Sequence, residues 1–202
     1  MRGGVRITYK DGRIYDGDIQ NGKANGKGKM SWSDDGHAYV YDGEWVNDEI
    51  NGKGKMSWSD DGRAYVYEGM WKNGKKNGIG NMTSWPKDME HSHEWVEDMT
   101  IYDGEWVNDE INGKGKYTWP NGDFYEGDWN NGNAHGYGTM KSSNGNLYKG
   151  EWNKGKKING TIQWGDGKEF RGLSNEHLSM SNPMYNSLSR KGTPTKQRRN
   201  PN

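Results

Sequence analysis

The sequence contains no cysteine and very few aliphatic side chains for its length. Only 29% of its 202 residues are hydrophobic, and among them are two Phe and four Leu. This composition excludes disulfide bonds and a thick aliphatic core. No run of 18 apolar residues occurs, and no apolar stretch follows Met1. We therefore expect neither a membrane span nor a signal peptide, which favours a cytoplasmic protein.

The sequence also lacks an excess of charge of one sign. It has 28 basic and 28 acidic residues, so nothing in the net charge attracts nucleic acid, and we expect no nucleic-acid partner. The distribution is uneven after Leu173, where Glu176 is the only acid. The bases of this segment are Arg190, Lys191, Lys196, Arg198 and Arg199. We expect residues 174–202 to be a basic, disordered tail.

Tryptophan, tyrosine and glycine are abundant instead, and they recur at fixed positions. The chain has 11 Trp, 12 Tyr and 32 Gly, and one phrase of the form aromatic-x-Gly-x-apolar repeats along it. Six copies start at Tyr15, Tyr41, Tyr67, Tyr102, Tyr125 and Tyr148, with a partial copy at Phe170. Such an internal period is typical of an array whose units bury their apolar faces on their neighbours.

Each copy has the pattern of a β-hairpin. In the copy at 125, Tyr125, Gly127 and Trp129 are spaced two apart, which places them on one face of a strand. Asn131-Gly132 follows as a turn signal, because both residues tolerate positive φ. Glycine repeated in the same register predicts that a ring from a neighbouring strand lies flat on the backbone there.

The hairpins are expected to pair edge to edge. The sequence therefore predicts an all-β fold, an elongated single-layer antiparallel meander over residues 1–173. Two copies carry extra segments, at 33–38 and 59–64, which predict a longer turn between hairpins. The wide gap before Tyr102 predicts an irregular insert at 83–101, either a protruding loop, which we favour, or a decayed repeat.

The phrase at 125–138, Tyr-Glu-Gly-Asp-Trp-x-Asn-Gly-x-x-His-Gly-x-Gly, resembles the MORN (membrane occupation and recognition nexus) repeat. The resemblance covers about 15–173. Two departures concern Ile19, which replaces Trp in the first copy, and the pairs Asn47-Asp48 and Asn108-Asp109, which replace Asn-Gly. These departures leave the local turn types open.

The resemblance implies a binding or scaffolding role. MORN arrays organise membrane junctions and cytoskeletal assemblies, receive a partner helix or peptide on an aromatic sheet face, and in some members self-associate through their ends. Transferred to this chain, the resemblance implies that the partner-binding residues are Tyr41, Trp45, Tyr67, Trp71, Tyr102, Trp106, Tyr125, Trp129, Tyr148 and Trp152. The same rings could instead be structural, closing each hairpin against its glycines.

No group of residues predicts catalysis, a metal or a cofactor. His91 and His93 lack a third spaced ligand, so a solvated loop is the better interpretation. Asp34-Asp35-Gly36 lacks the remainder of a calcium loop and is interpreted as a turn. The chain has no Cys nucleophile and no recognisable Ser/His/Asp arrangement. We therefore expect a protein that is not an enzyme.

Peripheral binding to an anionic membrane is the alternative function. The five tail bases, beginning with Arg190 and Lys191, would supply the lipid contact. The outward positions of the first strands are mostly acidic, however, and those of the second strands carry lysines. This pattern favours pairing of opposite charges within each hairpin over a basic face. The leading hypothesis is thus a non-catalytic scaffold that binds a protein partner.

Overall fold

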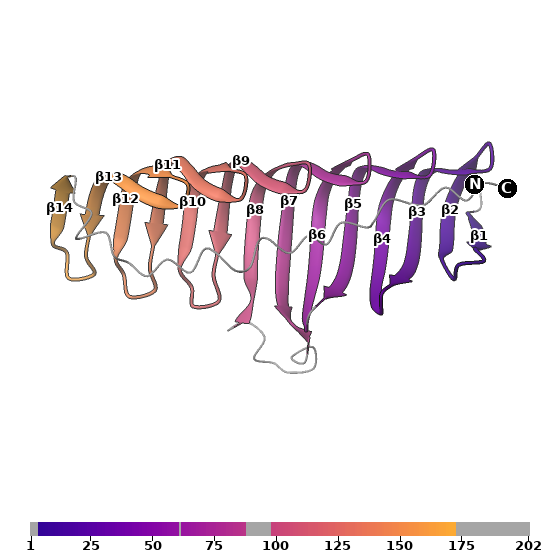
Figure 1. Ribbon diagram of the computed structural model, residues 1–202, viewed down its shortest axis with the longest axis horizontal. Coiled ribbons are helices and arrows are strands. Elements are labelled where there is room, and N and C mark those ends of the chain that lie inside the picture. Colours follow the sequence, from indigo (N-terminus) through magenta and orange to yellow (C-terminus); the bar gives the residue numbers. More distant parts are fainter. Residues whose placement is uncertain (1–3, 61, 88–97, 173–202) are drawn as a thin grey trace.

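The computed structural model describes residues 4–60, 62–87 and 98–172, which form one antiparallel β-sheet and contain no α-helix. Its 14 strands pair in the order of the sequence (Figure 1). The first seven are β1 (Val5–Thr8), β2 (Ile14–Gln20), β3 (Lys23–Asp34), β4 (His37–Val46), β5 (Glu49–Asp60), β6 (Arg63–Lys72) and β7 (Lys75–Pro86). The others are β8 (Thr100–Val107), β9 (Glu110–Thr118), β10 (Phe124–Asn130), β11 (Asn133–Lys141), β12 (Leu147–Asn153), β13 (Lys156–Gln163) and β14 (Glu169–Gly172). The predicted all-β, elongated antiparallel meander is confirmed.

Six hairpins follow β1, from β2–β3 to β12–β13, and each closes through a two-residue turn. Both turn residues have positive φ, for example 51° at Asn73 and 73° at Gly74. This is the type I′ conformation, which matches the twist of the strands. Asp48 and Asp109 adopt the same conformation, with φ of 69° and 72°. The departures from Asn-Gly therefore leave the turn type unchanged.

The second strand of every hairpin contains a β-bulge, where extra residues lie opposite the first strand just after its repeat glycine. In β4 the register shifts between Gly43 and Trp45, and β6 shows the same shift between Gly69 and Trp71. Bulges bend a strand and increase its twist. The hairpin tips accordingly curl over one face of the sheet along the upper edge in Figure 1. We call this covered face the inner face and the opposite one the outer face.

The extra segments at 33–38 and 59–64 lengthen strands and do not form longer turns. β3 and β5 have 12 residues each, whereas β13 has 8. β3 and β4 are joined by only Asp35 and Gly36, whose φ angles are 46° and 79°. The predicted longer turn at 33–38 is therefore wrong, because Ser33 and Ala38 pair as strand residues.

Strand pairing extends into the predicted insert from both sides. Thr83 pairs with Ile101 and Ser84 with Thr100, so β7 and β8 are direct neighbours in the sheet. The irregular part therefore begins after β7 and ends before Thr100. Its residues 88–97 lie outside the described residues, as does the predicted tail at 174–202.

Candidate binding surface

A row of glycines crosses the whole inner face where the strands bend. The strand register pairs them from one strand to the next: Gly17, Gly28, Gly43, Gly54, Gly69, Gly80, Gly104, Gly115, Gly127, Gly138, Gly150, Gly160 and Gly172. A Cβ placed on Gly54 would overlap the ring of Tyr41, and one on Gly80 would overlap Tyr67. The missing side chains make room for the tyrosine rings, as the glycine pattern predicted.

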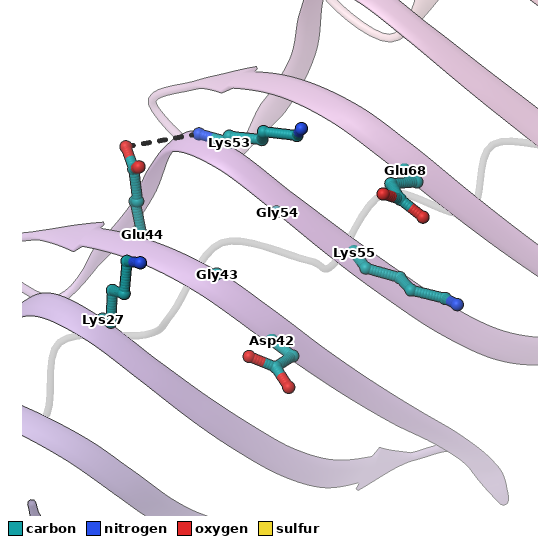
Figure 2. Close-up of a pocket in the computed structure, with 8 residues that line it drawn as sticks. All are labelled: Lys27, Asp42, Gly43, Glu44, Lys53, Gly54, Lys55 and Glu68. Carbon is teal, nitrogen blue, oxygen red and sulfur yellow. Dashed lines mark hydrogen bonds between the residues drawn. The ribbon is translucent and has the colours of Figure 1, made fainter.

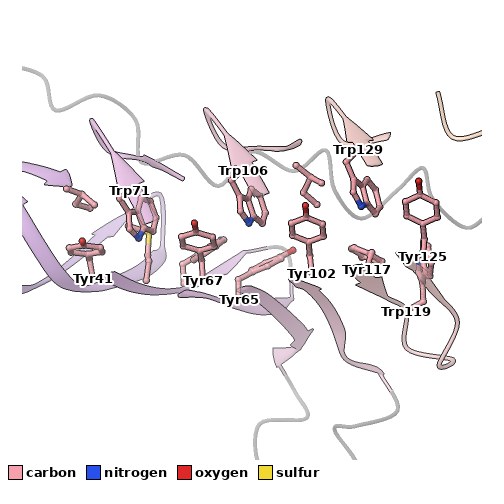
Figure 3. Close-up of a cluster of buried hydrophobic side chains, with 14 of the residues drawn as sticks. Tyr41, Tyr65, Tyr67, Trp71, Tyr102, Trp106, Tyr117, Trp119, Tyr125 and Trp129 are labelled. Atoms are coloured by element: carbon pink, nitrogen blue, oxygen red, sulfur yellow. The ribbon is translucent and has the colours of Figure 1, made fainter. Parts of the chain in front are cut away.

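Eleven aromatic rings lie in a line above these glycines. We call them the long ring row, which contains Tyr15, Trp45, Tyr41, Trp71, Tyr67, Trp106, Tyr102, Trp129, Tyr125, Trp152 and Tyr148. Each Trp, carried on a curled tip, meets the Tyr of its own hairpin and the Tyr of the hairpin before it (Figure 3). The ring centroids are 4.9 to 5.6 Å apart and the planes cross at 77° to 89°. Edge-to-face contacts of this kind add to the burial of the rings.

The polar atoms of these rings are satisfied by the backbone. The indole N–H of Trp71 donates to the carbonyl of Gly54 at 3.1 Å, one hairpin back. The hydroxyl of Tyr67 donates to the carbonyl of Met70 at 3.0 Å, beside the bulge. The same two bonds recur in the neighbouring hairpins. Every hairpin is therefore joined to the preceding one by an indole hydrogen bond as well as by strand pairing.

Burial changes how the tyrosines ionise. Removal from water raises the pKa of Tyr15 to about 12, with smaller contributions from Asp18 and other anions. Burial likewise raises the pKa of Tyr41, Tyr67, Tyr102, Tyr125 and Tyr148. A phenolate at these positions would lose its hydration and lie in an apolar row. The tyrosines of the long ring row therefore stay protonated over the physiological range.

The ten rings predicted to contact a partner all belong to the long ring row. Their side chains are almost fully covered, with exposed fractions of 0 to 4%. A partner could reach them only if the hairpin tips moved away. The curled tips cover these ten rings in this structure, and docking of a partner on them stays a prediction.

Four further rings lie on the same face, beyond the cover of the tips. Trp32, Tyr39, Trp58 and Tyr65 are directly paired across β3, β4, β5 and β6. We call them the short ring row. Trp32 stacks on Tyr39, and Trp58 on Tyr65, with centroids 5.2 Å apart in both pairs and planes within 9°. Trp58 and Tyr65 are buried, whereas Trp32 and Tyr39 are only half-buried.

The short ring row exists because β3 to β6 are long. The extra residues that were expected to form a turn extend these strands far enough to add one more inward position on each. The 26-residue spacing of the second and third copies was the available signal in the sequence. We missed its meaning because we assigned the added residues to a loop.

Acidic side chains surround the exposed end of the short ring row. Burial raises the pKa of Tyr39, and the nearby Asp60, Asp34 and Asp35 raise it further. The imidazole Nε2 of His37 lies 3.6 Å from the Asp60 carboxylate, and its Nδ1 contacts the carbonyl of Ser59. The half-exposed rings thus adjoin a negative local potential, which favours a ligand that carries apolar groups and positive charge.

The outer face carries two rows of charged side chains of alternating sign. In one row Asp42 pairs with Lys55, and Lys55 with Glu68. Figure 2 shows these residues around a shallow hollow over Gly43 and Gly54. The predicted pairing of acidic first strands with basic second strands matches this register. Such a face offers no continuous basic surface.

The remaining candidate sites are the aspartate turns, the two histidines and the basic tail, and only the turns lie among the described residues. Asp35 and Gly36 form a tight turn, and no cluster of three possible metal ligands occurs in 4–60, 62–87 and 98–172. His91 and His93 lie outside the described residues. The five tail bases, from Arg190 to Arg199, lie outside them too. Within the ranges that the structure covers, no helix is long and apolar enough to cross a membrane.

Comparison with known protein families gives one match. The model of the MORN repeat matches residues 15–37, 41–63, 67–84, 102–124, 125–147 and 148–157. The chain belongs to the MORN repeat family. The six matched segments begin at the same tyrosines as the six repeats of the sequence, and each covers the turn of one of the six hairpins. A search of curated proteins finds no significant match.

Proposed function

We propose that this MORN protein is a non-catalytic scaffold that binds a segment of a partner protein on the short ring row. The MORN array supports a scaffolding role in general. The finer assignment rests on one observation. Trp32 and Tyr39 are large aromatic side chains that remain half-buried at the end of a continuous row of rings.

The partner segment would be aromatic or aliphatic and would carry basic side chains. Trp and Tyr are the side chains that most often anchor protein interfaces, because they bury a large area at a small entropic cost. Asp34, Asp35 and Asp60 adjoin these anchors. A Lys or Arg beside the inserted apolar group would therefore gain favourable electrostatic energy there.

Selection from a random peptide library displayed on phage tests the proposal. The full chain is the bait, and Trp32→Ser removes the most accessible indole of the short ring row. We expect peptides that combine aromatic and basic residues, and we expect at least about a tenfold loss of affinity for the Trp32→Ser variant. Trp164→Ser is the matched control, because Trp164 is another half-buried indole, near the far end of the array.

Two results would overturn the assignment. One is a set of peptides that bind wild type and Trp32→Ser equally well. The other is a loss of binding in Trp164→Ser that equals the loss in Trp32→Ser. Circular dichroism of both variants shows whether the sheet is retained, so that a folding defect is not mistaken for a binding defect.

Membrane binding through the tail is the competing proposal. Co-sedimentation of the full chain with phosphatidylserine vesicles tests it, with Arg190, Lys191, Lys196, Arg198 and Arg199 changed together to Ser. Because each base near an anionic surface contributes about 1 kcal/mol, a tail-driven interaction would disappear in this variant and in high salt. Salt-sensitive binding that survives the tail change would contradict a scaffold that binds only proteins.

A further inference from the structure

The outer face of the third hairpin, β6–β7, departs from the pattern of its neighbours. In the neighbouring hairpins the row next to the bulge pairs a base with an acid across the strands, as in Lys27 with Glu44 and Lys114 with Asp128. Farther along the array, the exposed Tyr137 pairs with Glu151 in this row. In the third hairpin the corresponding positions are Met70 and Ile79, which are 42% and 60% exposed. The register places Lys53 opposite Met70 and Glu105 opposite Ile79.

The third hairpin lacks a side-chain hydrogen bond that its two neighbours have. In the second and fourth hairpins the carboxylates of Glu44 and Glu105 accept the backbone N–H groups of Lys53 and Lys114. Met70 occupies the equivalent position and has no carboxylate to offer. The third hairpin therefore lacks a hydrogen-bond acceptor and exposes two apolar side chains between strands that carry charges. Exposed apolar side chains at the centre of a charged face indicate an interaction surface.

The charges beside this apolar centre have opposite signs on its two sides. On the β5 side lie Lys53 and Lys55, and on the β8 side lie Asp103 and Glu105. In the row of Lys53 the side chains of β5, β6, β7 and β8 are therefore basic, apolar, apolar and acidic in turn. In the row of Lys55, Glu68 and Asn81 lie between this lysine and Asp103. A surface of this kind is complementary to itself when it is turned end for end.

We propose that two copies of this chain pack outer face to outer face about a two-fold axis that runs parallel to the strands, between β6 and β7. This operation lays β5 on the partner's β8, so that Lys53 faces the second copy's acid at position 105 and Lys55 faces the acid at 103. Met70 faces Ile79 of the second copy at the centre. An interface of this kind is isologous, with the same patch used twice.

Opposite charges of the two copies also face one another on both sides of the apolar centre. The acids Asp42 and Glu44 of β4 fall on the lysines 114 and 116 of the second copy's β9, because first strands are acidic and second strands are basic throughout this part of the array. Twisted sheets in face-to-face contact diverge away from their crossing point. The apolar pair thus lies where the two faces approach most closely.

The alternative two-fold axis, across the strands, is unfavourable. It would place every strand opposite the same strand of the second copy. Asp42 and Glu44 would then face the same two acids of that copy. Sliding the copies by one hairpin along the array would keep the charges complementary but would separate Met70 from Ile79. Charge therefore selects the axis, and the apolar pair selects the register.

The available area suits a weak dimer. Eight strands, β3 to β10, at about 4.8 Å spacing and with roughly 20 Å of their length in contact offer on the order of 800 Å² per copy, the size of a standard interface. Much of that area is charged and exposed, so its contribution is small and sensitive to salt. The proposal concerns the outer face and leaves the short ring row free for a partner.

Sedimentation equilibrium of the full chain over roughly 5 to 200 µM tests the dimer, because dissociation constants of weak interfaces lie in this range. The deciding variant is Met70→Glu, which gives the third hairpin the carboxylate already present at Glu44 and places it opposite Ile79 of the second copy. A glutamate at this position is compatible with the fold of the second hairpin, so we expect unchanged secondary structure. We expect the dissociation constant to rise at least about tenfold.

A charge swap provides the matched control. Lys55→Asp alone should weaken the dimer, because it places acid on acid, and Asp103→Lys alone should weaken it too. Both changes in one chain should restore it, since each new charge again meets its opposite in the second copy. Restoration would identify the two-fold axis.

Three results would overturn the proposal. The first is a monomer at the highest concentration. The second is a dimer that is unaffected by Met70→Glu. The third is growth beyond the dimer, which would indicate association through the ends of the array. None of these results bears on peptide binding at Trp32, so the two proposals fail separately.

Discussion

The two faces of the sheet differ in how regularly their residue types recur from hairpin to hairpin. On the inner face the Tyr and Gly positions keep their identity from hairpin to hairpin, and the Trp position departs from it at Ile19. The rings of the long ring row are 0 to 4% exposed. On the outer face the side chains vary, and the third hairpin replaces an acid and a base by Met70 and Ile79. The inner face therefore determines the fold, whereas differences between hairpins determine what the surface can bind.

The largest effect should be a loss of stability at alkaline pH, which originates in the buried tyrosines of the inner face. The six tyrosines of the long ring row have raised pKa values because they are buried. Above pH 10 the unfolded chain loses phenolic protons that the folded chain keeps, so the free energy of unfolding falls as pH rises. Each such tyrosine contributes up to about 1.4 kcal/mol per pH unit, so several kcal/mol are lost by about pH 11.

Urea unfolding at a series of pH values, together with tyrosinate absorbance, measures this loss. We expect the absorbance of the buried set to rise only when the sheet unfolds. Ionisation of all 12 tyrosines near pH 10 in a sheet that remains folded would contradict the burial of the long ring row.

The second-largest effect should come from the glycine row. In Gly54→Ala, the new methyl group would overlap the ring of Tyr41, which is fully buried and cannot move aside. Overpacking of this kind costs about 3 kcal/mol. Gly4→Ala is the control, because its Cβ would come no closer than 3.5 Å to other atoms. Thermal unfolding of both variants makes the comparison, and equal melting temperatures would show that the glycine row is not required for packing.

Lys76 is a charged side chain that is buried on the otherwise apolar inner face. It occupies the position held by Ile50 and Ile111 in neighbouring hairpins and is 7% exposed. Its ammonium lies 4.8 Å from the ring centroid of Trp106 and 5.4 Å from that of Trp58. Burial lowers the pKa of Lys76, and nearby Asp109 opposes that shift. Buried charges of this kind are often replaced by apolar side chains without loss of stability.

We therefore expect Lys76→Ile to stabilise the protein by about 1 kcal/mol at pH 7. In wild type, the cost of the buried ammonium is fully present below the lowered pKa of the folded state. It disappears as pH rises toward the ordinary lysine value of 10.5. The difference between variant and wild type should shrink over that range in urea unfolding experiments. A constant difference would mean that the lysine does not change its charge on folding.

The sequence predicted the inner face well and its accessibility poorly. The period-2 spacing of Tyr, Gly and Trp correctly indicated hairpins, and the glycines correctly indicated a ring lying on the backbone. The bulge opposite Glu44 could not be read from that spacing, because the two extra residues of β5 between Ile50 and Gly54 leave the alternation of residue types unchanged. The bulge curls the tip, and the curled tip buries the rings that the resemblance offered to a partner. The short ring row was missed for a related reason. Trp32 and Tyr39 pair only because β3 and β4 are long, and their spacing in the sequence does not show that length.

The smallest effect should come from a single change on the outer face. Met70→Glu gives back the carboxylate that Glu44 and Glu105 provide in their hairpins. The side chain at 70 already lies over Gly78, where a Cβ would be 3.1 Å from that of Met70, just as Glu105 lies over Gly113. The new carboxylate can therefore accept the backbone N–H of Ile79, which stabilises the monomer by about 0.5 to 1 kcal/mol. Urea unfolding at a concentration too low for dimerisation measures it, with Met70→Gln as the control that lacks the charge. If Met70→Glu lowers the stability, methionine contributes to the fold itself, and the outer face of the third hairpin is not reserved for binding.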